Sequence, residues 1–225
     1  SWALLAGTGL KWKSVWEYRE VFISGWLLTV VLSAVSLGLS LGIGLLTALA
    51  SRSSFLPLRS LAILYVEVIR GTPLLVQIFI FYYGLPSVGI ELSPITAGIL
   101  TLTLNVAAYM SETLRGSINA VTQGQWQAGT SLGLTRDQTL RYVVGPQALR
   151  AAVPSLSNSL ISLIKDTSLV SVIAVTELML ATKELISTTF QPFPLYLAAA
   201  AIYWVLSLSF EQIQRWMEKR VAYPY

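Results

Sequence analysis

Long uncharged stretches divide the chain into segments that are each long enough to cross a lipid bilayer. A hydrocarbon core about 30 Å thick requires about 20 apolar helical residues. The first stretch, residues 21–50, contains no charged residue and is rich in Leu, Val, Ser and Gly. The pattern predicts an all-α integral membrane protein with five transmembrane helices, at residues 21–50, 59–83, 93–115, 154–179 and 194–216.

The composition supports a membrane protein and limits its chemistry. Hydrophobic residues make up 54% of the 225 residues and charged residues 12%, so charges are too few to cover a water-facing surface. Seven Trp and ten Tyr suit the membrane–water boundary. The sequence has no Cys, which excludes disulfides and thiolate metal sites. It also has no His, the common metal ligand and neutral-pH base.

The two ends of the chain differ from the apolar stretches between them. Residues 1–20 contain three Trp and several charges, which predicts an interfacial helix on the outer membrane surface rather than a cleavable signal peptide. The alternative is a terminus that packs against nothing. The membrane domain is expected over residues 21–220, and residues 221–225 form a short tail.

The basic residues predict the orientation. Five spans place the termini on opposite sides of the membrane. With a cytoplasmic C-terminus, the cytoplasmic basic residues are Arg52, Arg59, Arg115, Arg136, Arg141, Arg150, Arg215, Lys219 and Arg220. The external ones are then Lys11, Lys13, Arg19 and Lys183. Because cytoplasmic loops carry an excess of Lys and Arg, we expect the N-terminus outside and the C-terminus in the cytoplasm.

The connection between the third and fourth spans, residues 116–153, is unusually long. A short helix is predicted at residues 125–132, ended by Gly133. The residues 135–138, Thr-Arg-Asp-Gln, have the form of a capping box. A second helix is predicted to stop at Gly145-Pro146. Such a segment either folds against its own membrane domain or projects as a knob held by another protein.

This loop resembles a known signature. The sequence GQWQAGTSLGLTRDQTLRYVVGPQA is similar to the cytoplasmic EAA-x3-G-x9-I-x-L-P pattern of ABC-type import permeases. With Gly133 and Pro146 aligned, residues 127–129 (Gln-Ala-Gly) occupy the EAA position and Gly145 stands where Leu is usual. The stretches EVIRGTPLLVQ, LNVAAYMSETLRGSI and NSLISLIKDTSLVSVIAVTEL also resemble the polar amino acid permeases of this superfamily, such as histidine, glutamine and arginine permeases. The resemblance covers about residues 25–220.

The resemblance implies a type I ABC importer permease of the bacterial inner membrane. Such a subunit dimerises, sits on two ATP-binding subunits and works with an extracytoplasmic solute-binding protein, with no nucleic acid partner. ATP and Mg are bound by the ATPase, so no cofactor is expected in this chain. The loop helix contacts the ATPase in this family, and the coupling residues carried over are Gln125, Trp126, Gln127, Ala128, Gly129, Leu132, Gly133 and Arg136. Position 127 is Gln where the family pattern has Glu, and we expect this change to weaken or alter the ATPase contact. Whether the second permease subunit is identical to this one stays open.

Polar residues inside the spans indicate a pathway or structural pairs. Glu67 and Arg70 are three apart and are predicted to form a structural ion pair within one helix. Two polar stripes at helical spacing are predicted to face a hydrated cavity that binds the ammonium and carboxylate of an amino acid. With their neighbours, these pathway residues are Asn105, Tyr109, Glu112, Asn158, Ser162, Lys165, Asp166, Thr167 and Ser168. The alternative for each is an interhelical hydrogen bond. Glu177 is expected to be a solvated loop acid.

The favoured function is a non-catalytic permease subunit for ATP-driven import of a polar amino acid. No Gly-x-x-x-x-Gly-Lys-Ser/Thr sequence occurs, so a partner must hydrolyse ATP. A secondary transporter or channel subunit is the main alternative, although these usually have more spans or inverted repeats. An intramembrane enzyme would need a Ser–Lys dyad through Lys165, since His is absent and Asp137 and Asp166 are the only Asp. Which amino acid is carried stays open.

Overall fold

The computed structural model describes residues 12–221, and every regular element in that range is a helix. The predicted interfacial segment at residues 1–20 therefore lies partly outside the described residues. Its described part includes a short helix and the start of a long one. The elements are α2 (Trp12–Glu17), α3 (Arg19–Ala50), α4 (Leu56–Gly71), α5 (Leu74–Phe79), η1 (Ile80–Gly84), η2 (Leu85–Val88), α6 (Pro94–Ala120), α7 (Gln123–Ser131), α8 (Arg136–Thr139), η3 (Leu140–Val144), α9 (Gly145–Asp166), η4 (Thr167–Ile173), α10 (Leu178–Thr189) and α11 (Pro192–Val221).

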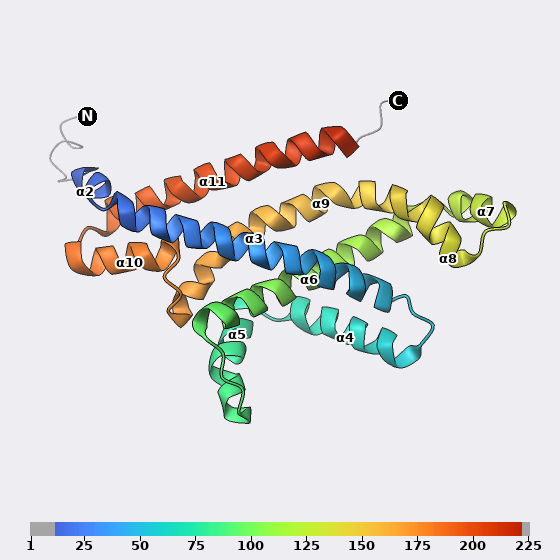
Figure 1. The fold of residues 1–225 in the computed structure, drawn as a ribbon, viewed down its shortest axis with the longest axis horizontal. Coiled ribbons are helices and arrows are strands. Elements are labelled where there is room, and N and C mark those ends of the chain that lie inside the picture. Colours follow the sequence, from blue (N-terminus) through green and yellow to red (C-terminus); the bar gives the residue numbers. More distant parts are fainter. Residues whose placement is uncertain (1–11, 222–225) are drawn as a thin grey trace.

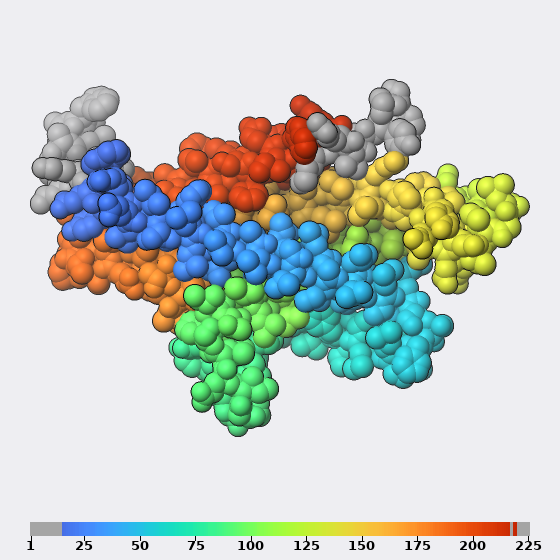
Figure 2. Space-filling view, in the orientation of Figure 1, coloured from blue at the N-terminus to red at the C-terminus, as the bar shows by residue number. Residues whose placement is uncertain are grey.

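Four long helices, α3, α6, α9 and α11, run lengthwise through the molecule (Figure 1). The short helices α7 and α8 lie at one end of this bundle, and α2 and α10 lie at the other (Figure 1). The segment formed by α5, η1 and η2 stands out from the side of the bundle (Figure 2). We refer to the two ends of the bundle as the loop end and the α10 end.

Small residues on one face of α3 allow it to pack closely against α6. Ser40 Oγ donates to Thr103 O at 3.0 Å. A Cβ added at Gly44 would lie 3.0 Å from Met110 Cβ, so the backbones approach closely there. Large apolar side chains of α3, α5, α6 and α9 close the core around this contact, among them Leu32, Ile78, Leu102, Met110 and Leu163. Close approach through small residues is typical of helices that associate within membranes.

Three helices are long and apolar enough to cross a membrane: α3, α6 and the Pro192–Trp216 part of α11. The pair Leu56–Gly71 and Leu74–Val88 meets the same criterion together, but it is bent by 109°. The predicted second span is therefore broken. Among the described residues the count is three, or four with the bent pair. The remaining predicted span, in the region of α9, stays a prediction.

The boundaries of α9 differ from those expected. The predicted helix stop at Gly145-Pro146 is wrong, because Pro146 lies in the first turn of α9, where its missing N–H costs no hydrogen bond. A π-helix, η3, leads directly into α9. A Cβ added at Gly145 would lie 2.6 Å from Leu140 O, so this turn requires glycine. The α-helix then ends at Asp166, and the 3-10 helix η4 follows it.

Candidate functional site

The break between α4 and α5 is held by the side chain of one buried residue, Gln77. Pro73 cannot donate a backbone hydrogen bond, so carbonyls near the break lack their helical partners. Gln77 Nε2 donates to Ile69 O at 2.7 Å, to Thr72 O at 3.1 Å and to Thr72 Oγ1 at 2.9 Å. Gln77 Oε1 accepts from Asn105 Nδ2 at 3.0 Å, which ties the break to α6. Gln77 was not among the predicted site residues, although an amide within an apolar run just after a proline is a usable signal.

A cavity of about 410 Å³ lies where this break faces α6 and α9. It brings together five residues of the two polar stripes predicted from the sequence. These five are Asn105, Tyr109, Asn158, Ser162 and Asp166. The other lining residues are Thr72, Pro73, Leu74, Val106 and Ser159. The two stripes therefore face a common space, as the spacing indicated.

Four of the predicted pathway residues do not line this cavity. Thr167 is buried and donates to Ile164 O at 2.7 Å, and Ser168 donates to Lys165 O at 2.7 Å. Lys165 instead lines an adjoining pocket of about 340 Å³ together with Asn158, Ile161, Ser162, Glu211, Gln214 and Arg215. The fourth residue, Glu112, belongs to an ion-pair cluster. Lys165 and Asp166, although adjacent in sequence, thus line different spaces.

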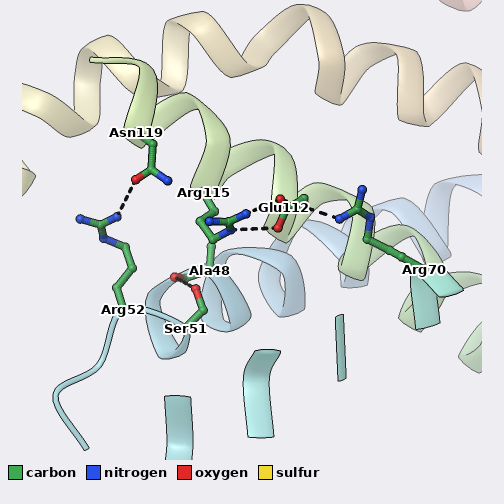
Figure 3. Close-up of polar contacts among 7 residues, drawn as sticks. All are labelled: Ala48, Ser51, Arg52, Arg70, Glu112, Arg115 and Asn119. Atoms are coloured by element: carbon green, nitrogen blue, oxygen red, sulfur yellow. Dashed lines mark hydrogen bonds and ion pairs between the residues drawn. The ribbon is translucent and has the colours of Figure 1, made fainter. Parts of the chain in front are cut away.

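The ion-pair cluster centres on Glu112 of α6, which lies between two arginines (Figure 3). Arg115 Nε and Nη2 lie 2.9 Å and 2.5 Å from the Glu112 carboxylate oxygens. Arg70 Nη1 of α4 lies 3.8 Å from Glu112 Oε1. The expected Glu67–Arg70 pair is therefore corrected: Arg70 reaches across to α6, while Glu67 is exposed. The Arg70 guanidinium also lies 5.4 Å from the centre of the Tyr109 ring.

The loop after α6 forms the compact helical projection that was predicted. The helix α7 covers Gln123–Ser131, close to the expected residues 125–132. Gly133 follows it with a φ of +82°, a left-handed conformation that favours glycine. The capping box is confirmed: Gln138 N donates to Thr135 Oγ1 at 3.3 Å, and Thr135 N donates to Gln138 Oε1 at 2.9 Å.

The two helices of this projection pack tightly at Gly129. A Cβ added there would lie 2.5 Å from Thr139 Cγ2, so only glycine fits. Leu132, by contrast, is 80% exposed, and Ala128 is also exposed. Gln125 accepts a hydrogen bond from Gln147 at 2.9 Å, which ties α7 to the start of α9. The two helices of the projection are therefore tightly packed at Gly129, and Leu132 is a large apolar side chain on its surface.

A basic pocket of about 680 Å³ lies between this projection and the ends of α3 and α6. It is lined by Arg52, Ile118, Asn119, Val121, Gln123, Trp126, Gln127, Thr130 and Arg136. Arg52 Nη1 donates to Asn119 Oδ1 at 3.2 Å, and its guanidinium lies 5.9 Å from the centre of the Trp126 ring (Figure 3 shows the Asn119 contact). Partial burial and the positive charges of Arg136 and Arg115 lower the pKa of Arg52. Arg52 was not predicted as a site residue, because only the fold brings it to the loop.

The opposite end of the bundle contains a buried acid, Glu177. Its side chain is fully buried, so the expectation of a solvated loop acid is wrong. Glu177 Oε1 accepts from Met179 N at 2.9 Å and Leu180 N at 3.1 Å, and thereby caps α10. Glu177 Oε2 accepts from Tyr203 at 2.5 Å, with Thr29 Oγ1 3.4 Å away. An acid directly before the apolar run of α10 was the available cap signal.

Comparison with known proteins places these features in a family. The family of binding-protein-dependent transport system inner membrane components matches residues 40–223. The L-cystine transport system permease protein TcyB of Bacillus subtilis (strain 168) is 41% identical over 221 residues, covering 97% of this chain and 94% of that protein. The glutamine transport system permease protein GlnP of Escherichia coli (strain K12) is 36% identical over 212 residues, covering 93% of this chain and 97% of that protein.

Solved structures agree with this assignment. A crystal structure of an amino acid ABC transporter with histidines has a TM-score of 0.89 and 38% identity, and the match covers 93% of this chain and 98% of that one. A chain of the MetNI methionine ABC transporter, in an inward-facing conformation, has a TM-score of 0.75 at 16% identity over 92% of this chain and 99% of that one, which shows a shared fold. The chain belongs to the family of binding-protein-dependent transport system inner membrane components, as a non-catalytic, multi-pass permease subunit of an ABC importer.

Proposed function

We propose that this permease forms part of the translocation pathway for a polar amino acid and that its cavity between α5, α6 and α9 contacts the solute. The observation that carries the proposal is the meeting of the two polar stripes in one space of about 410 Å³. A cavity of that size accommodates a small solute. The named solutes of the relatives, cystine and glutamine, are polar amino acids, which supports the same class here.

The cavity supplies groups for both ends of an amino acid. The Asp166 carboxylate accepts hydrogen bonds from an ammonium group. The hydroxyls of Ser162 and Tyr109 and the amide of Asn158 can donate to a carboxylate. These side chains come from α6 and α9, which are separate long helices of the bundle. A relative movement of the two helices would therefore change the fit to the solute.

The proposed topology has five crossings, with α9 as the fourth and an external N-terminus. The bundle supports it, because α11 runs towards the loop end and α3 starts at the α10 end (Figure 1). The nine basic residues assigned to the cytoplasm, against four outside, support a cytoplasmic loop end. The α10 end then faces the solute-binding protein.

We assign the loop projection to contact with the ATPase. In the proposed assembly, two ATP-binding subunits, which bind ATP and Mg, dock against two permease subunits. The exposed Leu132 is an apolar contact point, and Trp126, Gln127 and Arg136 line the basic pocket beside it. The packed Gly129 and the turn at Gly133 keep the projection stiff. A stiff projection is needed if movement of the ATPase is to reach the membrane helices.

The experiment is uptake of radiolabelled L-glutamine, L-histidine and L-cystine by liposomes containing the complete transporter. Asp166→Asn should raise KM about tenfold for the amino acid that is transported, since a charged hydrogen bond contributes about 1.5–3 kcal/mol. Glu67→Gln, an exposed acid on α4, serves as the matched control and should transport normally. Unchanged KM in Asp166→Asn would contradict a role for the cavity in solute binding.

Deletion of residues 125–132 tests the proposed contact with the ATPase. The proposal requires that this deletion releases the ATPase from the detergent-purified complex and stops ATP-driven uptake. Arg136→Glu should keep the membrane domain inserted and uncouple ATP hydrolysis from uptake. Normal import by the deleted protein would contradict the assignment of the loop projection.

A further inference from the structure

The side-chain amide of Gln77 has only one possible orientation. Its nitrogen lies 2.7 Å from Ile69 O and 3.1 Å from Thr72 O. Backbone carbonyl oxygens only accept hydrogen bonds, so the amide nitrogen must face them and Oε1 must face the other way. Gln77 is 3% exposed, so water does not offer alternative partners. The broken helix itself therefore fixes this amide.

The orientation of Gln77 in turn fixes Asn105. Because Gln77 Oε1 only accepts, Asn105 must turn its amide nitrogen towards it, at 3.0 Å. Asn105 Oδ1 then points away from Gln77. In the described residues, the buried side-chain atoms without a partner are Ser36 Oγ, Thr103 Oγ1 and Thr139 Oγ1. Asn105 Oδ1 is not among them and accepts no hydrogen bond from any described residue, so it is open to the cavity that Asn105 lines.

A second acceptor lines the same cavity. Asp166 of α9 lines it, and the adjacent Lys165 lines the adjoining pocket instead. No ion pair within 4.0 Å joins Asp166 to another described residue, so its carboxylate is available. An ammonium group has three donors and no acceptor, and it matches a carboxylate and an amide oxygen on facing helices.

We infer that Asn105 Oδ1 and Asp166 form a subsite for the ammonium group of the solute, and that Gln77 is the positioning residue that keeps Asn105 an acceptor. The inference rests on the proposed function and deepens it. Without Gln77, the Asn105 amide is free to rotate and present its NH2 group to the ammonium. Two donors would then face each other, and affinity for solutes with an ammonium group would fall.

The experiment measures binding to the complete transporter in lipid nanodiscs, without the solute-binding protein. The probes are L-glutamine with glutaramic acid, which lacks the ammonium group, and L-histidine with imidazolepropionic acid, which lacks it too. Gln77→Met should weaken binding of the amino acid about tenfold, the effect of losing a charged hydrogen bond. Binding of the matching analogue without an ammonium group should stay unchanged. A general disturbance of the helix would weaken both by the same factor.

Two further variants make the result decisive. Tyr65→Phe removes a different hydrogen bond to α6, from Tyr65 of α4 to Leu104 O at 2.6 Å, and should change neither affinity. Asn105→Leu keeps the bonds of Gln77 to the helix break and should reproduce the selective loss, even where Gln77→Met does not assemble. Equal losses for both members of a probe pair would overturn the ammonium subsite alone. Absence of L-glutamine and L-histidine binding in the unmodified transporter, together with unchanged KM in Asp166→Asn, would contradict the proposed function as well.

Discussion

Two acids in different parts of the bundle are held in different ways. At the α10 end, Glu177 is fully buried and accepts hydrogen bonds from neutral donors on α3, α10 and α11. On α6, the Glu112 side chain is 29% exposed and is held by Arg70 and Arg115. The first acid is enclosed by fixed protein donors, whereas the second is partly exposed and is held by charges on long flexible side chains.

The difference indicates which helix contacts are hard to separate. A buried carboxylate without its donors is costly, so the three helices around Glu177 must keep their relative positions. An exposed ion pair contributes little free energy, and its partners can separate without a large penalty. We therefore expect the α10 end to stay fixed. The contact between α4 and α6 that Arg70 makes should separate more easily.

The largest effect expected from this comparison is that of Glu177→Ala. The substitution leaves Tyr203 and the first amides of α10 without an acceptor, and should lower the free energy of unfolding by about 3 kcal/mol. Thermal unfolding of the purified protein in detergent measures the loss. Glu184→Ala on the exposed face of α10 is the control and should unfold like the original protein. An equal melting temperature for both variants would show that the α10 end is not fixed by its buried acid.

A smaller effect is expected inside the loop projection, at Gly129. Gly129→Leu overlaps with Thr139 and should destabilise the α7–α8 contact by about 2 kcal/mol. Amide hydrogen exchange over residues 123–139 should then speed up by roughly 30-fold. Gly124→Leu adds the same side chain where nothing lies within 4 Å, and should leave exchange unchanged. Similar exchange in both variants would mean that the projection can yield at Gly129.

The smallest effect is expected for Glu112→Gln. This change removes the charge between Arg70 and Arg115 and should cost less than about 1 kcal/mol, because the cluster is partly exposed. The difference in melting temperature should shrink further at about 1 M NaCl, where charges are screened beyond about 3 Å. A salt-independent loss as large as that of Glu177→Ala would remove the distinction between the two acids.

The residue pattern predicted the features that depend on local spacing. The stripe from Asn105 to Tyr109 and the stripe from Asn158 to Asp166 follow helical periodicity, and their meeting in one cavity agrees with it. The capping box at Thr135 and the stop at Gly133 were also predictable, because each depends on a few neighbouring residues. The hydrogen bonds and backbone conformations of these features are determined by residues close together in the sequence.

Features that depend on contacts between distant segments were not predicted. Glu67 and Arg70 have the right spacing for an ion pair, yet Arg70 pairs instead with Glu112 on the neighbouring helix α6. Glu177 looked like a loop acid because its partners, Thr29 and Tyr203, are far away in sequence. The family resemblance supplied the fold class, but it did not indicate which atoms of Gln77 and Asn105 face each other.

The direct junction of η3 with α9 has a mechanical consequence. From Arg136 to Asp166 the chain is helical without interruption, through α8, η3 and α9. At 1.5 Å per residue, Asn158 lies roughly 33 Å along this segment from Arg136. In the proposed assembly, a displacement of Arg136 would pass along this helical segment towards the cavity, and Pro154 inside α9 is a point at which the segment can bend.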